Sequence, residues 1–371
     1  MRRVLRLLIY FIAFVSMPFA YAGTGSIIIG QAIDLSGANG SVGRDYVAGI
    51  TTYFDSININ GGLNGRKIKY LVRDDHGSAE LSTKAVTDLI EKEKVDYLIG
   101  GIGTAVVDAV VANPAFMHSR HMLFAPLIES VRNYGERVIF WRPGPDQEMQ
   151  YIFSYFDKLG IRSVGIALQN TEDHQDMYRH VVAEIKKRNM ALSGTVHLSG
   201  APQQMHAETL ALAASAPNIV IAIADTVGTG IFLKAFRKHA QKTLVAGMSL
   251  TNLETLAEVG GSGTLEWTVF SQVVPNPLGR KMPVQLDHAT MMRKFRDEAL
   301  SALTLEGYVV AKTLCRAIEA GGANNQALQK FRTEKGLLDL GGLLINPSAP
   351  DQHLSGYVDI ALFRRGVGLL F

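Results

Sequence analysis

Short apolar runs alternate with amphipathic stretches along most of the chain. Residues 219–224 are a continuous run of Ile, Val and Ala, residues 26–33 are rich in Ile, and residues 45–58 carry an apolar side chain at every third or fourth position. The last spacing predicts a helix that buries one face, and continuous apolar runs are typical of parallel strands covered on both sides. Strands that alternate with helices in this way predict an α/β fold with parallel sheets.

The alternation is interrupted at three places that are rich in Pro or Gly. These are residues 141–145, 275–277 and 341–342. Pro and Gly mark turns and loops, so we expect the chain to leave one lobe and enter another near these breaks. Between the second and third breaks we predict an exposed loop over residues 276–286, followed by two helices.

The first 22 residues follow a different pattern. Arg2 and Arg3 precede a mostly apolar run over residues 4–15, and Ala20-Tyr21-Ala22 is a small-x-small cleavage pattern. This layout is typical of a secretory signal peptide. The run is shorter than the roughly 20 apolar residues of a spanning helix, which makes a retained membrane anchor the weaker alternative. We predict that residues 1–22 are cleaved near Ala22 and that the mature chain is exported.

Charge and cysteine content narrow the class of protein. The 371 residues include 37 Lys and Arg against 34 Asp and Glu, a net charge of +3. Arg2, Arg3 and Arg6 lie in the first 22 residues, so the rest of the chain is formally neutral, with 34 residues of each sign. A neutral chain lacks the positive field that nucleic-acid binding requires. The single Cys excludes an internal disulfide and a cysteine-based zinc site, and the length suits about two domains.

A Gly-rich turn is the first candidate for a ligand contact. Gly101-Ile102-Gly103 follows a predicted strand and precedes a predicted helix. Val106 takes the place of the third Gly in a dinucleotide-binding fingerprint, which argues against a nicotinamide or flavin cofactor. Backbone N–H groups at the start of a helix favour an anion or a carboxylate, and Thr104 adds a hydroxyl. A tight turn in which Thr104 is only the N-cap is the alternative.

The other chemistry-bearing residues form no catalytic constellation. The ten His residues show no metal-binding spacing, and no nucleophile elbow, phosphate-binding loop or calcium loop occurs. Asp74-Asp75 follows a strand and precedes a turn, which favours capping over acid–base chemistry. Cys315 falls in an apolar helix, where an inert buried thiol is expected. We therefore predict no enzyme activity, no cofactor and no bound metal.

Several short blocks recur in the order and spacing of a known family. The blocks are Asp34-Leu35-Ser36-Gly37, Gly61-Gly62-Leu63-Asn64-Gly65, Tyr97-Leu98-Ile99-Gly100, Val273-Val274-Pro275-Asn276-Pro277, Leu305-Glu306-Gly307-Tyr308 and Asp339-Leu340-Gly341-Gly342. Together they resemble the periplasmic branched-chain amino-acid-binding family, the type I solute-binding proteins of ABC importers. The resemblance runs over nearly all of residues 26–365.

The resemblance implies two Rossmann-like lobes with parallel sheets, joined by three hinge crossings. It places the crossings near Trp141, Ser271 and Gly342, where the composition breaks fall. The first lobe would comprise residues 23–141 and 272–342, and the second lobe residues 142–271 and 343–371. A ligand would lie between the lobes, which would close on it by bending at the hinge.

The resemblance also implies where a ligand is held on the first lobe. Members of the family usually bind a carboxylate at the helix after the third strand, with main-chain amides and a hydroxyl residue. Gly103, Thr104 and Ala105 match that position. A second hydroxyl residue normally follows the next strand, and this chain has Glu129 where Thr is usual.

The second lobe departs from the family pattern at two implied contacts. Ser249 stands where an acidic residue commonly pairs an ammonium group, and Asp225 or Thr226 stands where another aromatic residue is usual. If Glu129 faces the cleft, it repels a free carboxylate by roughly 1 kcal/mol in water and about 4 kcal/mol at an effective dielectric of 20. We therefore expect a cation, an amide or a neutral polyol rather than leucine. The alternative is that Glu129 faces water.

The sequence thus favours an exported solute-binding protein of the periplasm. Its partners would be a small polar ligand, such as an amino acid or a related compound, and the permease of an ABC importer. It would reach the membrane only through that permease, as a monomer. A ligand-sensing receptor or regulator of the same fold is the alternative, since fold does not fix function. An exported enzyme with an unrecognised site is a third possibility.

Overall fold

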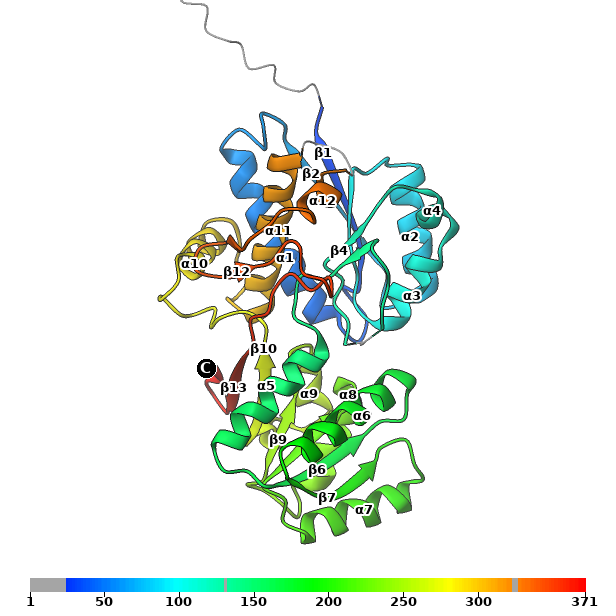
Figure 1. Cartoon of the computed structure of the whole chain (residues 1–371), viewed down its shortest axis with the longest axis vertical. Helices are drawn as coiled ribbons and strands as arrows, with labels where there is room; N and C mark the ends of the chain where they lie inside the picture. Colours follow the sequence, from blue (N-terminus) through cyan, green and yellow to red (C-terminus); the bar gives the residue numbers. More distant parts are fainter. Residues whose placement is uncertain (1–24, 130–131, 322–325) are drawn as a thin grey trace, which may run out of the picture.

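The computed structural model describes residues 25–129, 132–321 and 326–371. Two lobes lie one above the other, joined by segments at mid-height (Figure 1). The first lobe carries β1–β5 with α1–α4 and α10–α12, and the second lobe carries β6–β10, β13 and β14 with α5–α9. The prediction of a two-lobed α/β fold is confirmed. The predicted signal peptide, residues 1–22, lies outside the described residues.

The first lobe is built on a five-stranded parallel sheet in the order β2-β1-β3-β4-β5. Its strands are β1 (Ile27–Ile33), β2 (Ile68–Asp74), β3 (Tyr97–Ile99), β4 (Leu123–Phe124) and β5 (Val138–Ile139). The helices are α1 (Gly40–Ile59), α2 (Ala79–Glu91), α3 (Thr104–Ala112), α4 (Pro114–His118), α10 (Pro283–Phe295), α11 (Ala302–Gly321) and α12 (Gln326–Phe331). Helices α2, α3 and α4 cover one face, and α1 and α11 cover the other, so an apolar core forms on each side of the sheet.

The second lobe has a seven-stranded sheet in the order β14-β13-β10-β9-β8-β6-β7. Its strands are β6 (Ser163–Leu168), β7 (Ala191–His197), β8 (Ile219–Ile223), β9 (Leu244–Gly247), β10 (Thr268–Gln272), β13 (Asp359–Arg364) and β14 (Gly368–Leu370). Strands β6 to β10 are parallel, whereas β13 and β14 are antiparallel to their neighbours. The helices are α5 (Pro145–Lys158), α6 (Glu172–Lys187), α7 (Pro202–Ala214), α8 (Thr226–Phe236) and α9 (Leu253–Gly260), followed by a short 3-10 turn at Ser262–Leu265. Helices α5 and α6 pack on one face, and α7, α8 and α9 on the other.

Two glycines set the packing of α1 on α11. A Cβ atom at Gly49 would lie 2.0 Å from the Thr304 carbonyl oxygen, and one at Gly307 would lie 2.1 Å from the Tyr46 carbonyl oxygen. No side chain fits at such distances, so each position needs the residue that lacks one. The two helices therefore touch backbone to backbone.

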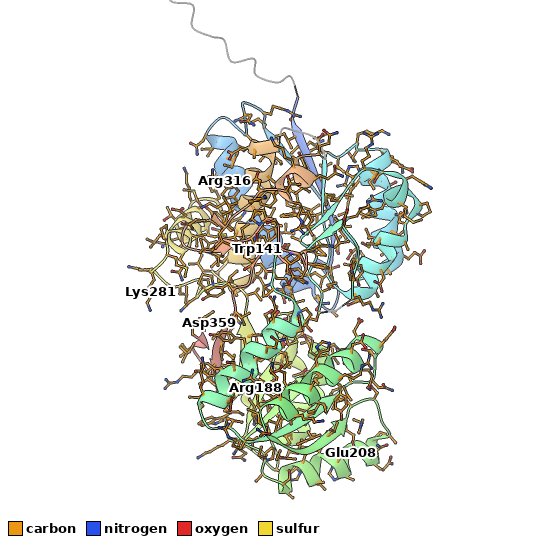
Figure 2. The ribbon with its side chains drawn as sticks, viewed as in Figure 1. Trp141, Arg188, Glu208, Lys281, Arg316 and Asp359 are labelled. Carbon is orange, nitrogen blue, oxygen red and sulfur yellow. The ribbon has the colours of Figure 1, made fainter. Side chains whose placement is uncertain are left out.

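The chain passes between the lobes three times. Trp141 belongs to the core of the first lobe, as Figure 2 also shows, and α5 of the second lobe starts at Pro145. Strand β10 then ends at Gln272, and Val274 is again part of the first core. After the third passage Ile360 packs in the core of the second lobe.

The third crossing differs from the prediction. Leu343, Ile345 and Leu354 are buried in the first core, so the chain leaves this lobe after Ser355 rather than near Gly342. The Gly pair instead forms the turn between β11 (Leu338–Asp339) and β12 (Leu344–Ile345). Asp339 Oδ1 accepts hydrogen bonds from the N–H groups of Gly341 and Gly342, at 2.8 and 2.6 Å. Both glycines have positive φ, which this turn requires and which Gly adopts readily. Because Gly is common in turns and in linkers alike, composition alone marked a break between lobes here.

The predicted exposed loop over residues 276–286 is wrong in its second half. Helix α10 starts at Pro283, and both Val284 and Gln285 are buried. Pro at the first helical position is favoured because its missing N–H has no partner there in any case. Among the described residues, no helix combines the length and the apolar character that crossing a membrane requires.

Candidate functional site

The carboxyl ends of the parallel strands in the two sheets meet at the boundary between the lobes. Ala38 follows β1, and its carbonyl oxygen accepts hydrogen bonds from Asn252 Nδ2 at 3.4 Å and from Thr255 Oγ1 at 3.3 Å. Asn252 follows β9 of the other lobe. Ligands of open α/β sheets bind outside the carboxyl ends of the strands. The residues that follow these strands are therefore the first candidates for a ligand site.

The start of α3 offers uncapped backbone groups on the first lobe. Gly103 is the N-cap with φ 96°, and Thr104 is the first helical residue, so the alternative that Thr104 is the N-cap is wrong. Gly103 has no side chain with which to accept an N–H of the first turn. A Cβ atom placed on Gly103 would meet nothing within 4 Å. Thr104 is half-buried and Ala105 is exposed.

Glu129 lines a small cavity of about 20 Å³, and the other residues of this cavity belong to the second lobe. Those residues are His174, Met177, Ala222, Ile223, Ala224, Thr229, Met248 and Thr251. They come from α6, β8, α8 and the segment after β9. Of the six predicted contacts, Glu129 is the one that this cavity includes.

The pKa of the Glu129 carboxyl group lies close to neutral pH. Removal from water raises its pKa from 4.5 to about 7, with a further contribution from the nearby Glu148, and the Arg142 guanidinium opposes both effects. The Leu250 backbone donates a hydrogen bond to the carboxylate. Near neutral pH the group is therefore ready to gain or lose a proton. Glu129 is half-buried and lines the cavity, which argues against the alternative that it faces water.

His174 of the second lobe and Glu129 of the first lobe line the same cavity. His174 is in the first turn of α6, where its backbone N–H donates to Thr171 Oγ1 at 3.3 Å. Burial lowers the pKa of the imidazole below its ordinary 6.5, so the ring is neutral at pH 7. Its Nδ1 atom is buried and has no hydrogen-bond partner in the part of the chain that the structure describes.

Asp225 already has partners on its own lobe. It is the N-cap of α8, and its Oδ1 accepts the Gly228 N–H at 2.7 Å. Its Oδ2 accepts a hydrogen bond from Gln169 Nε2 at 2.8 Å. In return, the Asp225 backbone N–H donates to Gln169 Oε1 at 2.9 Å. Asp225 thus fixes the start of α8 and is exposed to solvent.

Ser249 belongs to a cluster of buried charges at the hinge. Its hydroxyl donates to Glu148 Oε1 at 3.0 Å and accepts from Arg142 Nη1 at 3.2 Å. Glu148 also accepts hydrogen bonds from the Ser271 hydroxyl and from the Ser249 N–H. Ser249 therefore holds the second lobe to the first crossing.

Arg142 and Glu306 form the centre of this hinge cluster. Arg142 Nε and Nη2 donate to the two carboxylate oxygens of Glu306 at 3.1 and 2.9 Å, and the side chains are 3% and 2% exposed. The Arg142 carbonyl oxygen accepts a hydrogen bond from His353 Nδ1 at 2.8 Å. Arg142 thus connects the first crossing to α11 and to the segment that leads into the third crossing.

A second set of ion pairs bridges the lobes at the surface. Arg132 of the first lobe contacts Asp108 on α3 at 2.9 Å, and it also contacts Glu172 at 2.8 Å and Asp173 at 3.0 Å. The last two residues are in the first turn of α6, beside His174. Arg132 therefore holds the start of α6 against the first lobe.

Sequence reasoning missed the hinge cluster and His174. Arg142 stands between Trp141 and Pro143 at a predicted crossing, and a charged residue at such a place was the available signal. His174 lies in the first turn of a predicted helix that follows a predicted strand, as Thr104 does on the other lobe. Its position at a carboxyl strand end was informative, although its spacing to other His residues was not.

A larger hollow of about 780 Å³ lies on the first lobe, away from the boundary. Its lining includes Arg137 and Arg332. Arg137 donates to the Phe116 and His121 carbonyl oxygens, and Arg332 donates to the Pro347 and Ala349 carbonyl oxygens. Their guanidinium groups are used for folding, so this hollow is a weaker candidate despite its size.

Comparison with known proteins agrees with the two-lobed fold. Residues 26–342 match a family described as periplasmic binding protein. The Leu/Ile/Val-binding protein homolog 1 of Brucella melitensis is 24% identical over 359 residues, which are 92% of this chain and 92% of that protein. The crystal structure of an extracellular ligand-binding receptor from Verminephrobacter eiseniae has a TM-score of 0.83 at 21% identity, covering 94% of this chain and 100% of that one.

A third relative was solved with its ligand. It is the branched-chain amino acid transporter substrate binding protein of Streptococcus pneumoniae in complex with isoleucine. Its TM-score is 0.74 at 14% identity, covering 93% of this chain and 99% of that one. At such identities the solved structures share the fold with this chain.

Proposed function

Because the chain belongs to the periplasmic binding protein family, we propose that it captures a small polar ligand between its lobes and delivers it to the permease of an ABC importer. It is a binding protein and not an enzyme, as are the proteins that it resembles. The observation that carries the proposal is the cavity where Glu129 of one lobe meets His174 of the other. A ligand there contacts both lobes at once.

The predicted contacts divide into two groups under this proposal. The backbone amides at Gly103, Thr104 and Ala105 have no side-chain cap. Together with the Thr104 hydroxyl, they bind a polar group of the ligand. Glu129 also binds a polar group of the ligand. Asp225 and Ser249 act indirectly, because their side chains are already hydrogen-bonded. Asp225 positions α8, and Ser249 positions the segment after β9.

Ligand binding and lobe closure are coupled in this proposal. A ligand that touches both lobes favours the closed arrangement by its difference in affinity for the two states. Three crossings bend at a small number of residues, as hinges between domains do. Small-angle scattering with the true ligand should show a smaller radius of gyration, and an unchanged radius at saturation would argue against closure.

The proposal is tested by asking what the protein carries and what the cell loses without it. Native mass spectrometry of protein purified from the periplasm should show a bound small molecule, on a chain that starts near Gly23. Uptake of that molecule should fall when the gene is deleted and recover when it is restored. Unchanged uptake together with altered signalling would favour the ligand-sensing receptor, and a mature chain confined to the cytosol would refute the proposal.

A further inference from the structure

The hollow of about 780 Å³ on the first lobe is separate from the cavity between the lobes. Ser119 and Met122 of its lining precede β4, and Glu136 and Arg137 precede β5, so these residues lie at the amino ends of the two strands. The lobe boundary lies at the carboxyl ends. Helix α12 and the residues after it, with Arg332 among them, supply another part of the wall. Cavities of roughly 300–1,000 Å³ hold small molecules, so the hollow has room for a second ligand.

The charge of the lining is unbalanced. Three arginines, Arg120, Arg137 and Arg332, line the hollow with one carboxylate, that of the exposed Glu136. In the described part of the chain, none of these arginines forms an ion pair. Arg137 and Arg332 are half-buried, and removal from water lowers the pKa of both guanidinium groups, although Asp351 and Glu136 oppose this at Arg332. A cation that is partly removed from water without a paired anion is unfavourable, so the hollow favours an anionic ligand.

Folding occupies only part of these guanidinium groups. A guanidinium group has five N–H donors. Arg332 Nη1 and Nη2 each donate to one backbone carbonyl oxygen, those of Pro347 and Ala349, which leaves the Nε–H and a second N–H on each terminal nitrogen. Arg137 keeps one N–H of Nη1 beside its bond to a backbone carbonyl oxygen at 3.0 Å. The carbonyl contacts also fix the two side chains, so little conformational entropy is lost when an anion binds.

The rest of the wall suits a polar, uncharged body. Gln329 and Gln352 carry amides, which both donate and accept hydrogen bonds. The Thr333 hydroxyl donates to a backbone carbonyl oxygen at 2.7 Å, which leaves its lone pairs to accept. Met122 is a buried apolar member of the lining. Such a wall matches a molecule that carries several hydroxyl groups on a carbon skeleton.

We propose that this hollow is a second binding site, for an organic anion that carries a phosphate or carboxylate group on a hydroxylated body. Arg137 and Arg332 bind the anionic group, because a guanidinium group donates in parallel to two oxygens of a phosphate or a carboxylate. Arg120, which is exposed, adds positive charge. The inference goes beyond the proposed function, since the site lies outside the space between the lobes and takes a ligand of opposite charge to the one expected there.

The test uses sugar derivatives that differ in charge. The mature protein, freed of bound ligand, is titrated by calorimetry at pH 7 with glucose 6-phosphate, with gluconate and with glucose as their neutral counterpart. At least one of the two anions should bind with a Kd below about 1 mM. The anion that binds more tightly identifies the group in the hollow as a phosphate or a carboxylate.

Variants assign the bound anion to the hollow. Arg137→Gln and Arg332→Gln should each weaken anion binding at least about tenfold, and charge reversal by Arg120→Glu should weaken it at least about threefold. None of the three variants should change the result with glucose, which lacks an anionic group. Arg66→Gln is the matched control, because Arg66 is half-buried and donates to two backbone carbonyl oxygens but does not line the hollow. This variant should bind as the native protein does.

The outcomes decide the inference independently of the proposed function. A Kd above about 1 mM for both anions, or anion binding that all three variants leave unchanged, would overturn the second site. Circular dichroism melting shows whether each variant is folded. Arg120 is exposed and has no ion pair among the described residues, so Arg120→Glu keeps the test decisive even if the two half-buried arginines are needed for folding. The proposed function depends on the co-purified ligand and its uptake, which neither result changes.

Discussion

The hinge and the cavity both take charged or titratable side chains out of water, but they differ in how those side chains are satisfied. At the hinge, Arg142 and Glu306 pair through two hydrogen bonds, and Glu148 accepts from two serines. In the cavity, Glu129 retains a pKa raised to about 7, and His174 Nδ1 has no partner among the described residues.

The difference separates polar residues whose partners all lie within the fold from those that we propose to contact a ligand. Nearly all buried polar groups in proteins have hydrogen-bond partners, because an unpaired group costs free energy. The hinge follows this rule and needs nothing from outside. The cavity departs from it at His174 Nδ1, whereas Glu129 accepts a hydrogen bond from the Leu250 backbone and has a raised pKa.

The largest expected effect comes from breaking the hinge pair. Arg142→Leu leaves Glu306 and Glu148 buried without their cation, so the free energy of unfolding should fall by roughly 3–5 kcal/mol. Urea unfolding at pH 7 measures it. Arg73→Leu is the control, since Arg73 pairs with Glu93 at the surface with side chains 41% and 37% exposed, and its loss should cost less than about 1 kcal/mol. Equal destabilisation by the two variants would erase the distinction between hinge and surface.

Glu129 should make the stability of the unliganded protein depend on pH. Its pKa is raised from 4.5 to about 7 in the folded state, so folding favours the protonated form. The resulting stability is complete below pH 4.5 and is lost as the pH rises through about 7, a change of up to roughly 3 kcal/mol. The Glu129→Gln variant cannot titrate here. The difference between native and variant protein in urea unfolding should therefore shift across this window, and a constant difference would contradict the raised pKa.

Binding of a cationic ligand should show the opposite dependence on pH. A cation binds the ionised form of Glu129 and competes with the proton, so affinity should rise from pH 6 to pH 8 by about tenfold per unit below the pKa. Calorimetry with the cationic ligand that binds best measures the profile. The Glu129→Gln variant should bind weakly and with little change over this range, and a native profile that is equally flat would assign the cation to another group.

His174→Leu should stabilise the protein while it weakens ligand binding. The variant replaces a buried ring nitrogen that lacks a partner among the described residues, and removing such a group recovers about 1 kcal/mol. A higher melting temperature of the unliganded protein, with weaker ligand binding, is the expected combination. A lower melting temperature would show that His174 supports the fold in the way that the hinge residues do.

The smallest effect concerns the surface ion pairs between the lobes. Arg132→Ala removes contacts to Glu172 and Asp173 on α6, and exposed pairs contribute about 0.2–1 kcal/mol. Ligand affinity should fall by no more than about fivefold and should lose part of its dependence on salt. Arg179→Ala, which breaks a pair within α6, should leave both unchanged. Equal salt dependence in native and Arg132→Ala protein would show that these pairs do not act on closure.

The fold could be predicted from the sequence because it depends on repeated local patterns. Apolar runs and helical spacing marked the strands and helices of both lobes, and the Pro-rich breaks lie near the first two crossings. The third crossing was misplaced because Gly341-Gly342 makes a hairpin turn, and a Gly pair has the same composition in a turn as in a linker. Residues 343–354, which come after this turn, pack in the first core through long-range contacts.

The site was predictable only in outline. Glu129 stood out because it replaces an expected Thr, and the structure places it in the interlobe cavity. Ser249 and Asp225 were named by position, but their partners Glu148, Arg142 and Gln169 come from other segments that one sequence does not connect. His174 could not be distinguished from nine other His residues until the lobes were placed against each other.

The backbone contact between α1 and α11 has a mechanical consequence. At Gly49 and Gly307 the backbones of the two helices are in direct contact, so a shift of one helix at this point is passed directly to the other. Helix α1 begins two residues after Ala38, the residue that touches the second lobe. If the lobes separate at Ala38, we therefore expect α1 and α11 to move together.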